Sequence, residues 1–242
     1  MPGDVIAIAI SGADFLREHL RARMTLAMLV VLPALFVLVS ASVLGEFAKA
    51  LGGSVADDSA SALGAGWAAA FLAGALGFFQ VASSREADRR LALAGMGAGR
   101  VAVARISASI LLGLFVSAVA FGTLWLVAGI AHPAHAFVAI LIFALIYIGI
   151  GTLVGSFISE PLEGSLTVAF IFLIDAFSGP GMSGGGGIAQ LMPTRKAADV
   201  LIAAGAGQSS PAGDWIAVGL TTLGALLLAA GAFWFSARPR SA

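Results

Sequence analysis

The sequence contains no cysteine and very little charge, and both shortages limit what the protein can be. Without cysteine the chain forms no disulfide, holds no cysteine-ligated zinc and performs no thiol catalysis. Only 11% of its 242 residues are Asp, Glu, Lys or Arg, whereas 60% are hydrophobic. Such a composition leaves too little polar side chain to cover a water-soluble globule. The sequence therefore predicts an integral membrane protein, and its net charge of zero gives no indication of nucleic-acid binding.

Lysine is also scarce, since only Lys49 and Lys196 occur. A Walker A loop, G-x-x-x-x-G-K-[ST], needs a glycine directly before its lysine, whereas Ala48 and Arg195 occupy those positions here. The sequence therefore lacks this nucleotide-binding motif. If ATP drives the protein, another chain must bind the ATP and its Mg²⁺, and we expect this chain to bind no cofactor or metal.

Long apolar runs predict an all-α membrane protein with six transmembrane helices. About 20 apolar residues are enough to cross a hydrocarbon core about 30 Å thick. No Asp, Glu, Lys or Arg lies between Arg105 and Glu160, so this run is long enough for two spans, with a hairpin near His132 and Pro133. The other predicted spans are 24–44, 63–83, 164–177 and 215–236.

Basic residues predict the orientation, because Lys and Arg that flank spans tend to remain in the cytoplasm. Most arginines precede the first span, lie between the second and third spans, or follow the last, whereas Lys49, Arg195 and Lys196 lie on the other side. We therefore expect a multi-pass protein of the cell inner (plasma) membrane with both termini in the cytoplasm. The tryptophans should form interfacial belts, with Trp67, Trp125 and Trp215 at the outer face and Trp234 at the inner face.

Two segments on the predicted cytoplasmic side have helical patterns. In residues 1–22 apolar residues recur at roughly helical spacing, which predicts a helix lying in the membrane interface, with a solvated tail as the alternative. In the stretch SSREADRRLALAGMGAGRVAVAR, Ser84 can cap a helix in which Glu86 and Arg90 stand four residues apart. Glycines then end this short charged helix, which is either a docking element or a solvated loop whose arginines only determine topology.

The order of these features resembles the permease subunits of type 2 ATP-binding-cassette (ABC) exporters, which serve drug, polysaccharide and lipid export. The shared features are an amphipathic elbow helix (1–22), a six-span domain (23–242) and a cytoplasmic helix of the type R-E-x-x-R-R-L-x-L-x-G. A long segment precedes the last span, and in it residues 191–199, LMPTRKAAD, are similar to the family's L-x-P-x-x-x-x-x-D/E stretch. The resemblance covers nearly the whole chain.

This resemblance implies a specific set of partners. Two permeases, either two copies or two homologues, would pair in membrane lipid, and each would bind a cytoplasmic ABC ATPase that carries ATP and Mg²⁺. The chain would be a transport subunit and not an enzyme. Residues 84–104 would form the coupling helix, and the turn with Glu160 and Glu163 would form a second contact with the ATPase. The coupling-helix residues carried over as contacts are Arg85, Glu86, Arg89, Arg90 and Leu91.

The glycine-rich stretch GPGMSGGGG, residues 179–187, has three interpretations. Its G-x-S-G pattern around Ser183 fits intramembrane serine proteases, but no histidine follows Ser183 to act as the base. A phosphate cradle would place the glycines after a strand and beside a lysine, which is not the pattern here. A turn in the backbone is the third interpretation.

The length of the fifth predicted span favours the turn. Residues 164–177 extend only about 21 Å as a helix, which is less than the hydrocarbon core. We therefore expect this span to stop inside the bilayer. Residues 179–210 would form an extracellular glycine-rich hinge with a re-entrant helix over about 188–204, where protein or water satisfies the backbone. The hinge residues are Gly179, Gly181 and Gly184, and an ordinary outer loop is the alternative.

Asp175 is the most informative residue within the predicted spans, because a carboxylate there costs at least roughly 2.5 kcal/mol unless it faces a cavity or a partner. It either binds a cationic substrate group, pairs with Arg195 or Lys196, or lies at the interface where the span ends. The remaining candidates for the lining of a pathway are Phe170, Phe172 and Phe177.

Close helix packing is indicated by Gly151 and Gly155, which form a G-x-x-x-G motif that acts within one subunit or between two. The preferred function is an export permease for a hydrophobic or amphiphilic substrate. The alternatives are an ion-coupled secondary transporter, which would want several buried carboxylates, and a non-transporting membrane assembly subunit.

Overall fold

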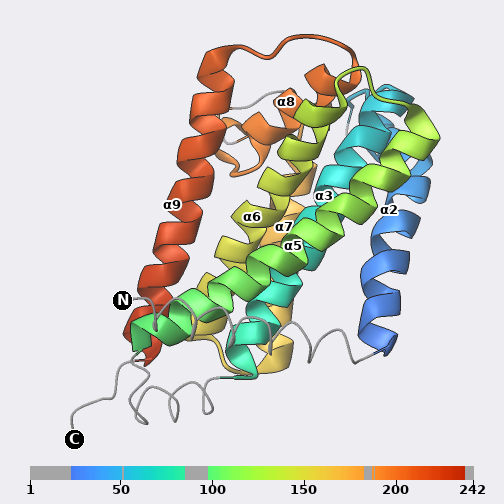
Figure 1. Cartoon of the computed structure of the whole chain (residues 1–242). Helices are drawn as coiled ribbons and strands as arrows, with labels where there is room; N and C mark the ends of the chain where they lie inside the picture. Colours follow the sequence, from blue (N-terminus) through green and yellow to red (C-terminus); the bar gives the residue numbers. More distant parts are fainter. Residues whose placement is uncertain (1–22, 51, 85–97, 183–186, 188, 238–242) are drawn as a thin grey trace, which may run out of the picture.

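The computed structural model describes residues 23–50, 52–84, 98–182, 187 and 189–237 (Figure 1). Within these residues the protein has seven α-helices, one 3-10 helix and no strand. The predicted elbow helix (1–22) and residues 85–97 of the predicted coupling helix lie outside the described part. The elements in chain order are α2 (Arg23–Ala50), α3 (Asp57–Ala82), α5 (Ala98–Ala128), α6 (Pro133–Phe157), α7 (Pro161–Phe177), η2 (Ala189–Leu191), α8 (Arg195–Gly205) and α9 (Ala212–Ala237).

Five of these helices, α2, α3, α5, α6 and α9, are long and apolar enough to cross a membrane. The protein is therefore an all-α, multi-pass membrane protein. Helix α7 has 17 residues, which correspond to about 25 Å of helix and are fewer than the roughly 20 residues that a straight crossing needs. The sixth crossing consequently stays a prediction.

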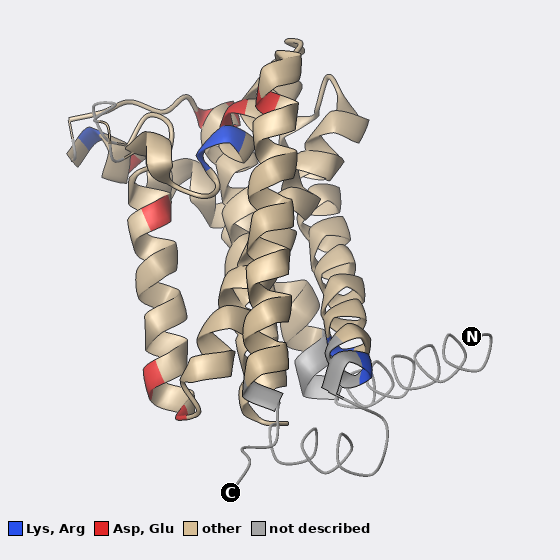
Figure 2. Cartoon of the chain, turned by 90° about the vertical axis from the view of Figure 1, so that its left-hand side faces the viewer, with Lys and Arg blue, Asp and Glu red and all other residues tan. Residues whose placement is uncertain are grey.

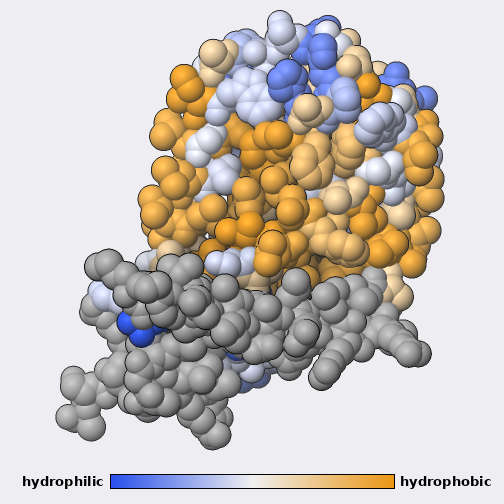
Figure 3. Space-filling model, viewed as in Figure 1, coloured by the Kyte–Doolittle hydropathy of each residue, from blue (hydrophilic) through white to orange (hydrophobic). Residues whose placement is uncertain are grey.

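The long helices run between two ends of a bundle, which we call the α8 end and the Glu160 end (Figure 1). At the α8 end α2 stops, α3 begins, α5 and α6 meet, and α8 lies before α9. At the Glu160 end α3 stops, α5 begins, and α6 connects to α7. Charged residues gather toward these two ends (Figure 2), and hydrophobic side chains cover much of the visible surface between them (Figure 3). This distribution matches a bundle whose middle faces lipid.

Helices α3 and α6 form the centre of the bundle because glycines let their backbones approach. A Cβ on Gly151 would collide with the carbonyl oxygen of Gly74, and a Cβ on Gly155 would lie 2.9 Å from the carbonyl oxygen of Phe78. From the other side, a Cβ on Gly77 would lie 2.9 Å from a carbonyl oxygen of α6. The G-x-x-x-G motif thus mediates packing within one chain, which decides between the two predicted alternatives.

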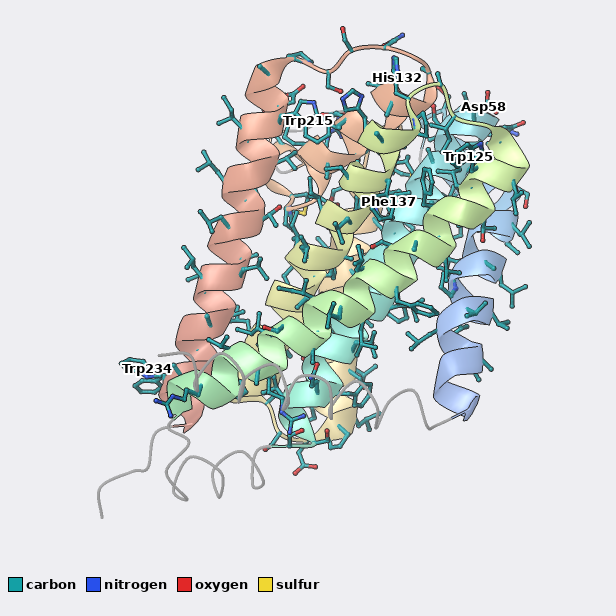
Figure 4. The ribbon with its side chains drawn as sticks, in the orientation of Figure 1. Asp58, Trp125, His132, Phe137, Trp215 and Trp234 are labelled. Atoms are coloured by element: carbon teal, nitrogen blue, oxygen red, sulfur yellow. The ribbon has the colours of Figure 1, made fainter. Side chains whose placement is uncertain are left out.

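The tryptophans other than Trp67 divide between the two ends of the bundle, as the predicted belts require. Trp125 and Trp215 lie toward the α8 end and Trp234 toward the opposite end (Figure 4). Trp67 is only 1% exposed and belongs to the protein core, so it does not face the membrane interface. Its position on the central helix α3 explains the difference, since neighbouring helices cover α3 on most sides.

Helix α5 begins earlier than the sequence suggested. It starts at Ala98, so residues 98–104, which were assigned to the predicted coupling helix, belong to α5 instead. A single glycine such as Gly99 costs a helix only about 1 kcal/mol relative to alanine, and this is too little to interrupt the apolar run that follows it. The predicted α5–α6 hairpin is confirmed, because α5 ends at Ala128 and α6 begins at Pro133.

Candidate functional site

A buried polar cluster surrounds Asp175, near the end of α7. Asp175 is only 2% exposed. The hydroxyl of Tyr147, on α6, donates a hydrogen bond to Asp175 Oδ2 at 2.9 Å, and the hydroxyl of Thr194, just before α8, donates to the same oxygen at 2.8 Å. The Thr194 backbone N–H lies 3.5 Å from Oδ1. We call Tyr147, Asp175 and Thr194 the Asp175 cluster.

The local sequence explains why these groups meet. Pro193 removes a backbone donor and helps to separate η2 from α8, so Thr194 stands at the N-cap of α8. Its hydroxyl makes no capping bond to α8 and instead donates to Asp175. Tyr147 is the only tyrosine in the chain and is fully buried. The cluster therefore joins α6, α7 and the start of α8 through one carboxylate.

The cationic partners considered for Asp175 lie elsewhere in the structure. Arg195 donates to the carbonyl oxygen of Ser178 at 3.4 Å and pairs with Asp199 at 3.7 Å. Lys196 pairs with Asp214, on α9, at 2.9 Å. Asp175 is thus stabilised by two neutral hydroxyls. Sequence reasoning missed both of them, although a lone tyrosine in an otherwise apolar span was an available signal.

The three phenylalanines proposed for a pathway have different surroundings. Phe172 is 7% exposed, and its ring packs against Phe71 and Tyr147 with centroid distances of 5.1 and 6.0 Å. Phe177 stacks on Phe47 of α2 at 5.4 Å. Phe170 is 63% exposed and points away from the core. Of the three, only Phe172 adjoins the Asp175 cluster.

The beginning of the glycine-rich stretch packs tightly against α3 and the α2–α3 connection. A Cβ on Gly179 would lie 2.6 Å from the ring of Trp67, and Gly181 has a φ of +77°, which favours glycine. A Cβ on Gly53 would collide with the carbonyl oxygen of Gly181. These glycines are therefore needed for the close packing of this stretch against α3 and the α2–α3 connection. Gly184 and Ser183, the nucleophile of the protease interpretation, lie outside the described residues.

The predicted re-entrant helix is divided into two pieces. The 3-10 helix η2 comes first and α8 follows, with Pro193 and Thr194 in the break. One side of α8 is buried through Ala197, Val200 and Leu201, among others. Helix α8 therefore packs with this buried side against the other helices at the α8 end of the bundle.

Charged side chains occupy the solvent side of α8. Burial raises the pKa of Asp199, while the nearby positive charges of Arg195 and Lys196 act in the opposite direction. A hydrogen bond from Lys196 to Asp214 raises the pKa of Lys196. Because the Lys196 side chain is 50% exposed, this ion pair contributes at most about 1 kcal/mol to holding α8 against α9.

The residues proposed as a second partner contact lie at the opposite end of the bundle. Glu160 and Glu163 are exposed where α6 connects to α7. Leu162, between them, is 71% exposed, and Phe157, at the end of α6, is 67% exposed. The turn therefore presents two carboxylates and two large apolar side chains on its surface. The proposed coupling-helix contacts Arg85, Glu86, Arg89, Arg90 and Leu91 lie outside the described residues.

Comparison with known proteins adds no relative: no model of a known protein family matches the chain, and no curated protein matches its sequence. Among the described residues, no group of three or more His, Asp or Glu side chains could hold a metal ion. The fold and the site define the class of an all-α, multi-pass membrane protein with a buried carboxylate that links three helices.

Proposed function

We propose that this chain is the transmembrane permease subunit of a type 2 ABC exporter. It would form a pathway for a hydrophobic or amphiphilic substrate, together with a second copy of itself or a homologous permease. A separate cytoplasmic ABC ATPase would bind and hydrolyse ATP. The proposal includes six crossings of the inner (plasma) membrane, an N-terminal elbow helix and cytoplasmic termini.

The observation that carries this proposal is the arrangement between α7 and α9. Helix α7 is short, a tight glycine turn follows it, and η2 and α8 then pack against the α8 end before α9 returns through the bundle. A fifth span that stops early and is followed by short helices is what the resemblance to type 2 permeases implies. Among the described connections, those from α5 to α6 and from α6 to α7 are short reversals by comparison (Figure 1).

The positions of the two proposed ATPase contacts support the same function. Helix α3 ends and α5 begins at the Glu160 end, so both ends of the connecting segment 85–97 are attached there. The exposed turn with Glu160 and Glu163 lies at that end too. One partner docked on this end is therefore within reach of both contacts. The exposed side chain of Leu162 adds an apolar group that such a partner would cover.

The arginine distribution supports a cytoplasmic position for the Glu160 end. The connection between α3 and α5 and the first turns of α5 contain Arg85, Arg89, Arg90, Arg100 and Arg105 in sequence. Lys49, at the end of α2, and the basic pair at the start of α8 occupy the other end. Under the positive-inside rule this bias supports a cytoplasmic position for the Glu160 end, which is the side where the proposed ATPase would dock.

The test is co-purification of the tagged full chain from its native membrane. We expect a soluble ATPase that contains a Walker A motif to co-purify with the wild-type chain. The triple variant Glu86→Ala, Arg89→Ala, Arg90→Ala should insert normally. It should lose at least about 90% of the co-purifying ATPase, because the substitutions remove the charged groups that would contact the ATPase.

A matched control uses charges at the other end of the bundle. Glu46 and Lys49 form an exposed pair at 2.8 Å on α2, and the double variant Glu46→Ala, Lys49→Ala should retain the ATPase. Absence of any ATPase from the wild-type preparation, under conditions that preserve complexes, would contradict the permease assignment. Equal loss in both variants would contradict the docking position.

The buried carboxylate favours one alternative, an ion-coupled secondary transporter, because Asp175 lies inside the bundle beside an ionisable phenol. Proteoliposomes that contain the purified chain alone distinguish the two functions. Substrate flux driven by an imposed proton or sodium gradient, and abolished in Asp175→Asn, would favour the secondary transporter. A permease without its ATPase should show no such gradient-driven flux.

A further inference from the structure

A cavity of about 260 Å³ lies at the α8 end of the bundle, apart from the Asp175 cluster. Its walls come from the start of α3, the end of α5, the α5–α6 connection, the first turn of α6 and the end of α8. Many of the wall residues are alanine or glycine, including Ala62, Ala128 and Ala136. Small side chains at the place where these elements converge explain why the helices leave space there, and the cavity is open to the surface at Asp58 and Ala206.

The chemistry of the walls is apolar with one negative charge. Leu124, Leu201 and Ile202 contribute the larger apolar surfaces, and Asp58 and Ser59 of α3 contribute the polar side chains. No lysine, arginine or histidine is among the lining residues of the described chain. A carboxylate beside an apolar wall and without a neighbouring cation in that wall favours a positively charged ligand.

Asp58 lies in the first turn of α3 and, unlike its neighbour Asp57, also forms part of the cavity wall. Acidic residues in the first turn of α3 stabilise the helix dipole, but Asp57 occupies the same turn and does not line the cavity. Within the described residues Asp58 makes no side-chain hydrogen bond or ion pair, whereas Lys49, Lys196 and Arg195 pair with other carboxylates. Figure 4 shows Asp58 at the α8 end. Its charge is therefore available to the cavity.

We propose that this cavity binds a small organic cation with an apolar body, of the alkylammonium or arylammonium class. The ammonium group lies at Asp58 and the apolar body lies against Leu124, Leu201 and Ile202. The size agrees, because an apolar cavity of about 150 Å³ accommodates benzene, so the volume here leaves room for a ring and a compact cationic group. This binding needs no ATP and no second subunit, so it goes beyond the proposed permease function.

The experiment titrates the purified full chain, in non-ionic detergent micelles, with benzyltrimethylammonium by isothermal calorimetry. Phenylacetate, which has a similar size and the opposite charge, is the comparison ligand. We expect saturable binding of the cation and no saturable binding of the anion. Asp58→Asn should weaken cation binding on the order of fivefold, the effect of removing one exposed charge. Asp57→Asn is the matched control and should bind like the wild type.

A second variant tests the cavity itself. Gly205 lines the cavity, and a Cβ there would meet no heavy atom within 4 Å, so Gly205→Leu adds bulk without a backbone collision. It should reduce binding of the cation while leaving the melting temperature of the protein close to the wild-type value. If Gly205→Leu does not fold, the comparison of Asp58→Asn with Asp57→Asn decides the proposal.

Three results would overturn the proposal. They are the absence of saturable cation binding by the wild type, equal affinities in the two aspartate variants, and binding of phenylacetate as strong as that of the cation. Since no ATPase is present in the experiment, each of these failures is separate from a failure of the permease assignment, which the co-purification tests.

Discussion

The central helices and the outer helices of this bundle differ in burial much more clearly than in hydropathy. In α3, 72% of the most apolar window is buried, and in α6 61%, whereas α2 and α9 have 22% and 17%. Yet the mean hydropathy is 1.7 for α3, the lowest of the five, and 2.6 for α2. In a membrane, hydropathy therefore separates crossing helices from loops but does not separate centre from periphery.

The difference lies in side-chain size. Lipid is as apolar as leucine, so helices associate where small residues permit close van der Waals contact. Helix α3 has glycines and alanines along the surface that meets α6, and Gly74 and Gly77 touch the α6 backbone. Helix α9 instead exposes large side chains such as Leu220, Leu228 and Phe235. A helix lies at the centre of the bundle when its small residues let neighbouring helices pack closely against its backbone.

The largest expected effect tests this explanation directly at the centre. Gly151→Ala places a methyl group against the Gly74 carbonyl oxygen, and we expect it to lower the free energy of unfolding by about 3 kcal/mol or to prevent folding. Thermal unfolding of the purified protein in detergent, followed by tryptophan fluorescence, measures the change.

The matched control is on the periphery. Gly219, on α9, is exposed, and a Cβ there meets no heavy atom within 4 Å. Gly219→Ala should leave stability unchanged or raise it by up to about 1 kcal/mol, as expected for alanine in a helix interior. If both variants changed the free energy of unfolding equally, close backbone approach would not explain why α3 and α6 form the centre of the bundle.

An intermediate effect is expected where the short helices join the centre. Asp175→Ala leaves the hydroxyls of Tyr147 and Thr194 buried without their acceptor, so it should lower the free energy of unfolding by about 2 kcal/mol. Asp214→Ala removes only the surface pair with Lys196 and should cost less than about 1 kcal/mol. Equal losses in the same unfolding assay would mean that the Asp175 cluster does not hold α7 and α8 to α6.

The smallest effect has the opposite sign. Ser117, on α5, is fully buried, and its hydroxyl has no hydrogen-bond partner within the described residues. Ser117→Ala removes an unsatisfied polar group and should stabilise the protein by roughly 0.5–1 kcal/mol. Ser107 on the same helix donates to the carbonyl oxygen of Val103 at 2.8 Å, and Ser107→Ala should change stability by less than about 0.5 kcal/mol. Destabilisation by Ser117→Ala would indicate a partner for this hydroxyl.

Much of the helical layout could be predicted from local signals. Pro133 and Pro161 begin helices, as the proline preference for the first turn implies, and α7 ends at Phe177 as expected. Glycines were harder to interpret. Gly99, one of the glycines expected to end the short charged helix, lies inside α5, and Gly179, which stays a proposed hinge residue, packs tightly against Trp67. A glycine permits several structures, and its neighbours in space select among them.

The candidate site was only partly predictable. Asp175 was recognised because a carboxylate in an apolar span is costly, but its two hydroxyl partners are 28 and 19 residues away in the sequence. The lining of the cavity near Asp58 comes from four helices and a connection, and none of its residues has an unusual local pattern. Contacts between distant segments leave no periodic signal in a single sequence.

By itself the sequence determined that the chain enters a membrane, about where its long helices begin and end, and that a carboxylate would be placed inside. Those properties depend on the free energy of moving each residue from water into lipid, which is nearly independent of its distant neighbours. Only the tertiary structure decided that α3 and α6 form the centre, that Tyr147 and Thr194 stabilise Asp175, and that Asp58 lines a cavity. These outcomes depend on shape, because inside lipid the contacts that form are those whose surfaces fit.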